Sequence, residues 1–430
     1  MKIFILVAFI LTYAAIIAFP RKKPMVAGVA AFVCAGGCLI FGKTGFIEIF
    51  RAIDLNVVLM LVGIMITVSA FSYSQMPDFI ADKLIAKVPN ALIAIVLLSV
   101  LSGLISAFID NVATVLMLAP IGIAVALKTK VSPIPVIICI AVSSNLQGAA
   151  TLVGDTTSIM LGSFANMSFS DFFFLNGKLS IFWAVELGAV LTIPVIVFIF
   201  RKNREKLCFE SEDIKIKSVV PTILLLTNIL TLIAVSFIPA ENKPAVTNGL
   251  ICIAFAFAAF IFTAIKYKKE GLTQSVKDVD FATVFFLIFL FIIIFTVEKV
   301  GIIDDISELF ASLGDKNVFL LYTVIVFGSV LFSAFIDNIP YVATMLPVIR
   351  ALCAALPTVS PYLLYFGLLC GATLGGNLTP VGASANVVGI GILNKAGYKV
   401  KNSDFFKIGI PFTLVAVLGG YTFCWFVWGA

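Results

Sequence analysis

The sequence predicts an all-α polytopic membrane protein built from inverted repeats, with about 11 spanning segments. Three observations support this fold class. The 430 residues are 61% apolar and 12% charged, whereas soluble domains are about 45–50% apolar and about 25% charged. The apolar residues fall into runs long enough to cross a bilayer, and one polar motif occurs twice, 227 residues apart. These features exclude a water-soluble protein, a disordered chain, a coiled coil and a disulfide-stapled secreted module.

Apolar runs define the expected spans. In chain order they cover 3–19, 25–42, 55–73, 134–165, 179–200, 219–238, 245–265, 281–298, 361–394 and 408–428. The runs 134–165 and 361–394 contain polar breaks, so we expect two broken helices there. Two longer stretches, 91–127 and 318–355, are interrupted by the repeated motif, and we expect two oppositely oriented re-entrant helical hairpins. The first run is kept as a helix because no small-residue cleavage site precedes Arg21-Lys22-Lys23.

Basic residues orient the chain. If both long stretches are hairpins, 21 of the 29 Lys and Arg residues fall on one side, and such an excess marks the cytoplasmic face. Treating either hairpin as a full crossing would invert every later loop. We therefore expect a multi-pass protein of the bacterial inner (plasma) membrane with both termini outside. The basic residues lie between apolar runs, so they do not form a nucleic-acid patch.

An internal repeat organises the chain. Residues 105–111 read Ile-Ser-Ala-Phe-Ile-Asp-Asn and residues 332–338 read Phe-Ser-Ala-Phe-Ile-Asp-Asn. The stretch 151–154 is matched by 379–382, and Asp54 is matched by Asp280. One copy begins outside and the other inside, as in secondary transporters that work by alternating access. We expect scaffold helices at 1–53, repeat 1 at 54–200, a cytoplasmic basic loop with linker helices at 201–279, and repeat 2 at 280–430.

Polar breaks inside the repeats form the candidate site. Backbone without helical partners cannot face lipid, so each break must line protein or a water-filled cavity. Glycine releases the helix, while hydroxyl, amide and carbonyl oxygens can bind a desolvated ion, and the ends of half-helices add dipoles. The candidate residues at the hairpin tips and in the two breaks are Asp110, Asn111, Asn145, Gly148, Thr151, Asp155, Thr156, Asp337, Asn338, Gly376, Asn377, Thr379, Ser384 and Asn386.

Asp110, Asp155 and Asp337 are the most informative members of this set. An ionisable group inside the membrane is costly unless paired or hydrated, and by default it marks a functional site. These acids suit proton exchange or a small cation, and Na⁺ is expected at Asp110 and Asp337 with the neighbouring Asn111 and Asn338. Alternatively, Asp and Asn only cap the hairpin helices, which would leave their presence at two equivalent places unexplained.

Other polar residues in the spans allow less specific interpretations. Asn145 and Gln147 fit ion ligands and interhelical hydrogen-bonding groups equally well. Glu186 and Glu298 are expected to be interfacial or paired. The chain has no histidine, so histidine catalysis, metal sites and pH switches are absent. The eight scattered cysteines are expected to pack as small hydrophobes.

The repeated motif at the hairpin tips is followed in the second copy by Gly-Asn-Leu-Thr-Pro-Val-Gly-Ala-Ser-Ala-Asn-Val-Val at 376–388. This combination resembles the pattern of the ion transporter superfamily. More narrowly, it is similar to the branch with ArsB-type arsenite permeases, NhaD sodium/proton antiporters and the melanosomal P protein. The similarity covers both repeats. It implies opposed hairpins, two broken helices and a homodimer with a scaffold and a moving transport unit. It also implies coupling to H⁺ or Na⁺ with no other cofactor.

Two departures from relatives bear on the substrate. Related dicarboxylate carriers bind sodium and substrate carboxylate through Ser-Asn-Thr at both tips, where this chain has Asp110-Asn111-Val112 and Asp337-Asn338-Ile339. An acidic tip repels a dianion and favours a proton, a cation or a neutral hydroxide such as arsenous acid. Relatives also often read Gly-Asp-Pro-Pro-Asn where residues 154–158 here read Gly-Asp-Thr-Thr-Ser, which weakens any transfer of substrate identity.

Three rival classes fit less well. Residues 37–44 match the phosphate-loop pattern, which would suggest an ATP-driven pump, but this pattern needs a preceding strand and a soluble nucleotide domain. A separate soluble ATPase partner is left as an alternative. An intramembrane aspartyl protease would need two facing aspartates, and Val153-Gly154-Asp155 lacks the partner motif. Two-sided pseudo-symmetry argues against a channel.

We therefore expect a non-enzymatic secondary carrier of the ArsB/NhaD type. Its expected activity is proton-coupled efflux of a small inorganic ion or oxyacid such as arsenite or antimonite. A Na⁺/H⁺ antiporter is the alternative, and a citrate-like di- or tricarboxylate symporter is less favoured.

Overall fold

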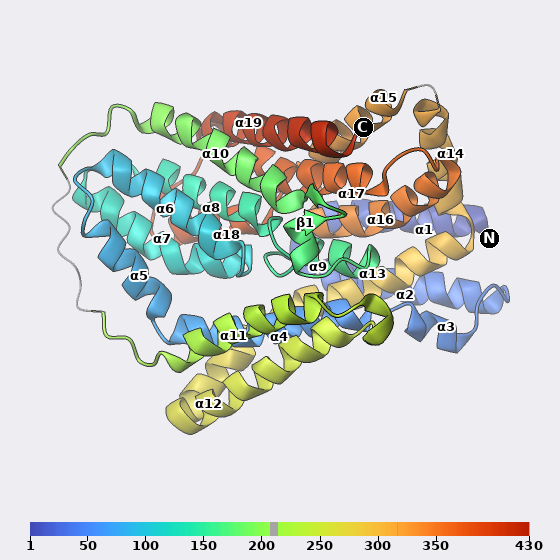
Figure 1. Ribbon diagram of the computed structural model, residues 1–430, viewed down its shortest axis with the longest axis horizontal. Helices are drawn as coiled ribbons and strands as arrows, with labels where there is room; N and C mark the ends of the chain where they lie inside the picture. The colour runs from blue at the N-terminus through green and yellow to red at the C-terminus, as the bar shows by residue number, and fades with distance from the viewer. Residues whose placement is uncertain (207–213, 316, 430) are drawn as a thin grey trace.

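The structure is a computed structural model that describes residues 1–206, 214–315 and 317–429, and it is almost entirely helical. Most helices run along the long axis of the molecule, side by side (Figure 1). Cys208 and part of the expected basic loop at 201–217 lie outside the described residues.

The chain begins with a pair of helices. Helix α1 (Lys2–Ala18) is followed by the short turn Pro20–Lys22 and by α2 (Lys23–Ile40), and the two helices pack against each other. The phosphate-loop match at 37–44 therefore begins inside a helix and does not follow a strand. A short helix α3 (Phe46–Arg51) leads into the first repeated segment.

The segment 54–200 contains seven helices. They are α4 (Leu55–Tyr73), α5 (Met76–Ile85), α6 (Ala91–Ser106), α7 (Asn111–Lys128), α8 (Pro133–Gly148), α9 (Thr156–Phe164) and α10 (Ile181–Phe200). A two-stranded antiparallel ribbon, β1 (Phe174–Leu175) and β2 (Lys178–Leu179), precedes α10. The residues expected to form a re-entrant hairpin, 91–127, form the helix pair α6–α7, and those expected to form a broken helix, 134–165, form the pair α8–α9.

Two helices link this segment to the second one. Helix α11 (Val220–Ser236) and helix α12 (Thr247–Lys277) pack against α4 along one edge of the molecule (Figure 1). Helix α12 continues past the expected span at 245–265, with a break at Lys268. Its added length is the charged stretch before Asp278.

The second segment repeats the order of elements of the first. It contains α13 (Phe281–Lys299), α14 (Ile302–Gly314), α15 (Val318–Ser333), α16 (Asn338–Ala355), α17 (Pro361–Leu369), α18 (Ser384–Lys395) and α19 (Asn402–Trp428). A π-helical turn at Cys370–Leu374 and a 3₁₀ turn at Gly376–Leu378 separate α17 from α18.

Helix caps correspond between the two segments. Asp54 caps α4 and Asp280 caps α13, each accepting a hydrogen bond from a backbone N–H in the first turn. Asn90 and Asn317 cap α6 and α15 in the same way. Such caps satisfy N–H groups that have no partner within the helix. The two halves therefore begin their hairpins from equivalent positions along the chain.

The distribution of polarity is that of a multi-pass membrane protein. Seven helical stretches among the described residues are long and apolar enough to cross a membrane, and five further apolar helices are shorter. Large apolar side chains such as Phe32 and Leu230 are exposed, with exposed fractions of 77% and 63%, whereas Asn145 and Asn377 are fully buried. Because lipid solvates apolar groups and leaves polar groups unpaired, this arrangement suits a bilayer. The prediction of a helical polytopic membrane protein is confirmed.

Candidate functional site

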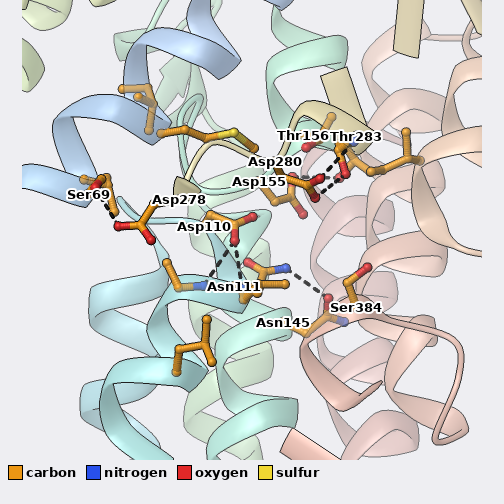
Figure 2. A pocket seen from close by; sticks show the side chains of 18 of the residues that line it. Ser69, Asp110, Asn111, Asn145, Asp155, Thr156, Asp278, Asp280, Thr283 and Ser384 are labelled. Carbon is orange, nitrogen blue, oxygen red and sulfur yellow. Dashed lines mark hydrogen bonds between the residues drawn. The ribbon is translucent and has the colours of Figure 1, made fainter. Parts of the chain in front are cut away.

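One cavity of about 290 Å³ contains residues from both hairpin tips. Figure 2 shows Asp110 and Asn111 of the first tip in this cavity, together with Ser384 of α18. Its walls come from α4, α7, α8, α9, α16, α18 and the link between α12 and α13. Eight of the predicted site residues line it: Asp110, Asn111, Asn145, Asp155, Thr156, Asp337, Asn338 and Ser384. The structure thus gathers residues more than 200 positions apart around one space.

The tip aspartates cap helices and also line this cavity. Asp110 Oδ2 accepts hydrogen bonds from the backbone N–H of Val112 (2.9 Å) and of Ala113 (3.2 Å) at the start of α7. Asp337 Oδ1 accepts from the N–H of Ile339 (3.3 Å) at the start of α16. Capping, the alternative interpretation of these residues, is therefore one part of their role. It coexists with a place in the cavity wall.

The tip asparagines lie just behind the carboxylates and are buried. Ser106 Oγ donates to Asn111 Oδ1 (3.0 Å), and Asn111 Nδ2 donates to Asn145 Oδ1 (3.1 Å). In the second half, Ser333 Oγ donates to Asn338 Oδ1 (3.4 Å). Each tip is thus held by a serine from the preceding helix of its own hairpin.

Asn145 and Asn377 connect the two broken helices. Asn145 Nδ2 donates to the carbonyl oxygen of Thr373 (2.8 Å) and to Asn377 Oδ1 (3.1 Å). Asn377 Nδ2 donates back to the carbonyl oxygen of Val142 (2.8 Å). Both side chains are fully buried, and Asn145 also lines the cavity. Asn145 therefore makes the interhelical hydrogen bonds that were one of its two expected roles. Its position in the cavity wall is compatible with the other, a ligand to a bound ion.

Six of the predicted site residues do not line the cavity: Gly148, Thr151, Gly376, Asn377, Thr379 and Asn386. The hydroxyls of Thr151 and Thr379 donate to the carbonyl oxygens of Ala107 and Ala334, just before the tips. A Cβ at Gly376 would lie 2.8 Å from Asn338 Oδ1. These residues therefore fix the breaks against the tips.

Asp155 presents a carboxylate oxygen without a partner. Its side chain is 7% exposed, and Oδ1 accepts from the N–H of Ser158 (2.7 Å) and from Thr157 Oγ1 (2.8 Å). Oδ2 is buried and has no hydrogen-bond partner among the residues that the structure describes. Because a buried oxygen of this kind is costly unless it is satisfied, a proton or a cation in the cavity would stabilise it.

Sequence reasoning missed a second group of lining residues. Ser69 and Ser72 lie one turn apart on α4, Lys277 is the last residue of α12, and Asp278 and Asp280 lie in the link between α12 and α13. Ser69 Oγ donates to Asp278 Oδ2 (2.6 Å; Figure 2). The spacing of the two serines was an available signal, because residues three apart share a helix face. With these residues, the cavity is lined by five aspartates and one lysine.

Lys23 has a role that its sequence context did not indicate. It was expected only to mark the cytoplasmic side, yet its Nζ lies 2.5 Å from Asp337 Oδ2. The exposed fractions of the two side chains are 25% for Lys23 and 11% for Asp337. No basic side chain in the described ranges forms an ion pair with Asp110.

Residues outside the cavity include the two membrane glutamates. Gln147 Nε2 donates to Glu186 Oε2 (3.4 Å), and Glu298 forms an exposed ion pair with Arg350 (2.7 Å). Both glutamates are thus paired, as expected. The cysteines within the described part of the chain are unpaired thiols, and all but Cys353 are buried.

A second, larger cavity of about 710 Å³ lies at the other end of α4. Asp54 and Asn56 line it, together with Arg51, Ser163 and Lys243. At 1.5 Å per residue, the 13 residues from Asn56 to Ser69 correspond to about 20 Å of helix. The two cavities therefore open at opposite ends of one helix.

Comparisons with known proteins agree on a transporter family. The family model CitMHS, described as "Citrate transporter", matches residues 6–371. A "46 kDa membrane protein" of Mycobacterium leprae is 30% identical, with 99% of this chain and 98% of that protein covered. An uncharacterized transporter of Mycobacterium tuberculosis is 29% identical over the whole of both chains. The human P protein is 24% identical, with 95% of this chain and 58% of that protein covered.

Solved structures share the fold at low sequence identity. The YdaH transporter of Alcanivorax borkumensis superposes with a TM-score of 0.60 at 13% identity, covering 90% of this chain and 88% of that one. MtrF of Neisseria gonorrhoeae, from a class described as antimetabolite efflux pumps, gives 0.58 at 15% identity, covering 89% and 83%. With the P protein among the relatives, the resemblance to the ion transporter superfamily is confirmed.

Proposed function

The chain belongs to the CitMHS citrate-transporter family, and we propose that it is a cation-coupled secondary carrier that works by alternating access. In this proposal, protons or Na⁺ bind at the two Asp-Asn tips and drive a small inorganic ion or oxyacid across the plasma membrane. The observation that carries the proposal is the single cavity where both tips meet, lined by five aspartates and one lysine.

The charge of the cavity decides between substrate classes. Two like charges about 5 Å apart repel by about 3 kcal/mol at an effective dielectric constant of about 20, and several carboxylates face the same space. A free citrate trianion is therefore disfavoured, whereas a proton, a metal cation or neutral arsenous acid is accommodated. Citrate, named by the family description, is the second candidate, and its negative charge would have to enter together with compensating cations.

Alternating access is supported by the matched order of helices in the two halves and by the two cavities at opposite ends of α4. We infer that the halves are inserted in opposite directions, so that α6–α7 enters from the cytoplasm and α15–α16 from outside. The cavity at the tips includes Lys277, from a basic segment. Because basic segments favour the cytoplasmic side, this structure corresponds to an inward-facing state with both termini outside.

We propose an efflux direction, in which protons and cargo cross the membrane in opposite directions. The proton gradient across a bacterial plasma membrane is directed inward, so protons that enter through the tip carboxylates can drive cargo out. An exchange of this kind needs the same carboxylates to face each side in turn. The proposal therefore requires saturable flux and counterflow.

The test is flux through purified protein in proteoliposomes that contain a pH-sensitive dye. The vesicles are challenged in turn with Na⁺, arsenite, succinate and citrate. We expect saturable, counterflow-competent proton movement with Na⁺ or arsenite. Proton movement with citrate alone would favour the second candidate, and unsaturable flux without counterflow would make the protein a channel.

A further inference from the structure

The two hairpin tips have the same sequence but different electrostatic partners. Each tip reads Phe-Ile-Asp-Asn, and each aspartate caps the following helix and lines the cavity. Asp337 nevertheless pairs with the Lys23 ammonium at 2.5 Å, whereas Asp110 has no basic partner in the part of the chain that the structure describes. The asymmetry arises from outside the repeats, because Lys23 belongs to the N-terminal helices.

Lys23 occupies a position that its own helix disfavours. It is the first residue of α2, where the helix dipole places positive partial charge that destabilises a nearby cation. Asp337 offsets this repulsion, and no other ion pair of Lys23 occurs among the described side chains. The ammonium is thus held at the tip by one carboxylate, and it can leave when that carboxylate binds another cation.

Neighbouring contacts hold Lys23 within reach of the tip. Tyr13 of α1 donates its hydroxyl hydrogen bond to the carbonyl oxygen of Pro340 (2.6 Å), and it also contacts Thr344 Oγ1 at 2.5 Å. Both partners lie on α16, in the turns that follow Asp337. The α1–α2 pair is therefore docked onto the second hairpin by uncharged hydrogen bonds as well as by the ion pair.

We propose that the Lys23 ammonium fills the cation position of the Asp337 tip as a built-in counter-ion, which an incoming monovalent cation must displace. The Asp110 tip is then the position open to a free cation. This inference rests on the proposed function and identifies what regulates its site. Exchange of one ammonium for one monovalent cation leaves the charge at the Asp337 carboxylate unchanged, and the released ammonium, whose side chain is already 25% exposed, is then solvated by water.

A purely structural ion pair makes a different prediction. If Lys23 only fastens α2 to the hairpin, its neutral replacement lowers stability and activity but leaves the number of bound cations unchanged. If Lys23 occupies a cation position, removal of its charge opens that position, and each chain binds one additional cation. The count of bound cations therefore separates the two roles.

The experiment counts cations on the full-length chain in detergent. ²²Na⁺ binding is measured at alkaline pH, and proton uptake after an acid jump is measured without Na⁺. Both are measured under conditions in which the modification of Lys23 described below shows that the ammonium of the wild type is still paired with Asp337. We expect Lys23→Gln to bind one more cation per chain than the wild type, as Na⁺ or as a proton. The double variant Lys23→Gln with Asp337→Asn should return to the wild-type count.

Two matched controls keep the readout specific. Lys23→Arg preserves the charge, and Tyr13→Phe removes a docking hydrogen bond without changing charge, so both should keep the wild-type count. An unchanged count in Lys23→Gln, for Na⁺ and for protons alike, would overturn the inference. Flux is measured separately, so an added cation without any transport would support the inference while contradicting the proposed function.

A second measurement uses the wild-type chain and does not depend on the folding of a variant. Saturating cation should release the Lys23 ammonium and increase its modification by an amine-reactive probe, as read by peptide mass spectrometry. We expect at least a threefold increase at Lys23 and none at Lys2, whose ion pair with Asp305 is distant from the cavity. Equal modification with and without cation would contradict the displacement.

Discussion

At the scale of single residues, the tip aspartates combine a structural and an electrostatic task that substitution can separate. Asp110 and Asp337 accept backbone hydrogen bonds and also give the cavity its negative charge. Asparagine caps helices about as well as aspartate. An Asp→Asn change therefore removes the charge and keeps an acceptor oxygen for the cap.

The first prediction concerns this charge. Asp110→Asn is expected to reduce coupled transport at least tenfold without a change in thermal stability. Asp337→Asn should lose transport equally and also lose about 1–3 kcal/mol of stability, because the largely buried Lys23 ammonium is left without its partner. Proteoliposome flux and thermal unfolding in detergent measure both effects.

The matched control for these variants is Asp54→Asn. Asp54 caps α4 but lies in the second cavity and away from the tips. It should keep at least half of the wild-type flux. Full activity in Asp337→Asn would remove that carboxylate from the mechanism.

The second prediction concerns the close approach at Gly376. A Cβ there would meet Asn338 Oδ1 at 2.8 Å and the carbonyl oxygen of Gly382 at 3.0 Å, so Gly376→Ala must displace the tip asparagine. We expect a loss of about 1–3 kcal/mol and of most transport. Gly391→Ala is the control, because nothing lies within 4 Å of its Cβ and alanine favours a helix by about 1 kcal/mol. Equal behaviour of the two variants would refute this packing argument.

Some site residues were predictable and others were not, for a physical reason. Asp110, Asp155 and Asp337 stand out because a charge within an apolar run has few structural explanations. Lys23, Asp278 and Asp280 lie at the ends of runs, where charges ordinarily mark a membrane boundary. Only the packing of the α1–α2 pair and of the α12–α13 link against the tips brings these three residues to the site.

At the scale of elements, apolar run length located the long helices, but amphipathic helices were missed. Helices α5 and α14 have 10 and 13 residues and carry charges, so their sequences contain no apolar run of spanning length. They occupy equivalent places before the two hairpins. The repeated motif thus indicated that two units exist but did not reveal every helix within them.

The third prediction tests the link between the broken helices. Asn145 and Asn377 each donate to a carbonyl oxygen of the other half, at 2.8 Å. Residues in one hydrogen-bond network couple by about 0.5–3 kcal/mol, so the double variant Asn145→Leu with Asn377→Leu should be less destabilised than the sum of the single variants. Unfolding free energies in detergent measure the coupling. Strict additivity would show that the two halves are not linked through these side chains.

At the scale of the whole molecule, exposed ion pairs join helices at the end opposite the tips. Lys2 pairs with Asp305 (2.7 Å), linking α1 to α14, and Arg350 pairs with Glu298 (2.7 Å), linking α16 to α13. Exposed pairs of this kind contribute about 0–1 kcal/mol each. Contacts this weak can break and re-form if α14 moves past α1 and α16 moves past α13, which a carrier with alternating access requires.

The last prediction tests the sidedness of the two cavities. Ser69 lines the cavity at the tips and Asn248 lines the cavity at the other end of α4. If the halves are inserted in opposite directions, Ser69→Cys should react with a membrane-impermeant thiol reagent only from the cytoplasmic side, and Asn248→Cys only from outside. Right-side-out and inverted vesicles give the two comparisons. Background labelling is limited by replacing with serine the half-buried Cys353 and also Cys208, which lies outside the described residues; the remaining six cysteines are buried.

The same labelling is then repeated while the carrier turns over. An alternating carrier must expose Ser69→Cys from outside in part of its cycle, so a cation gradient that drives turnover should make the outer reagent effective as well. Under the same gradient, the outer reagent should react less with Asn248→Cys. Labelling of both positions from the same side would contradict the opposed insertion of the two halves, since α4 would then not separate the cavities across the membrane.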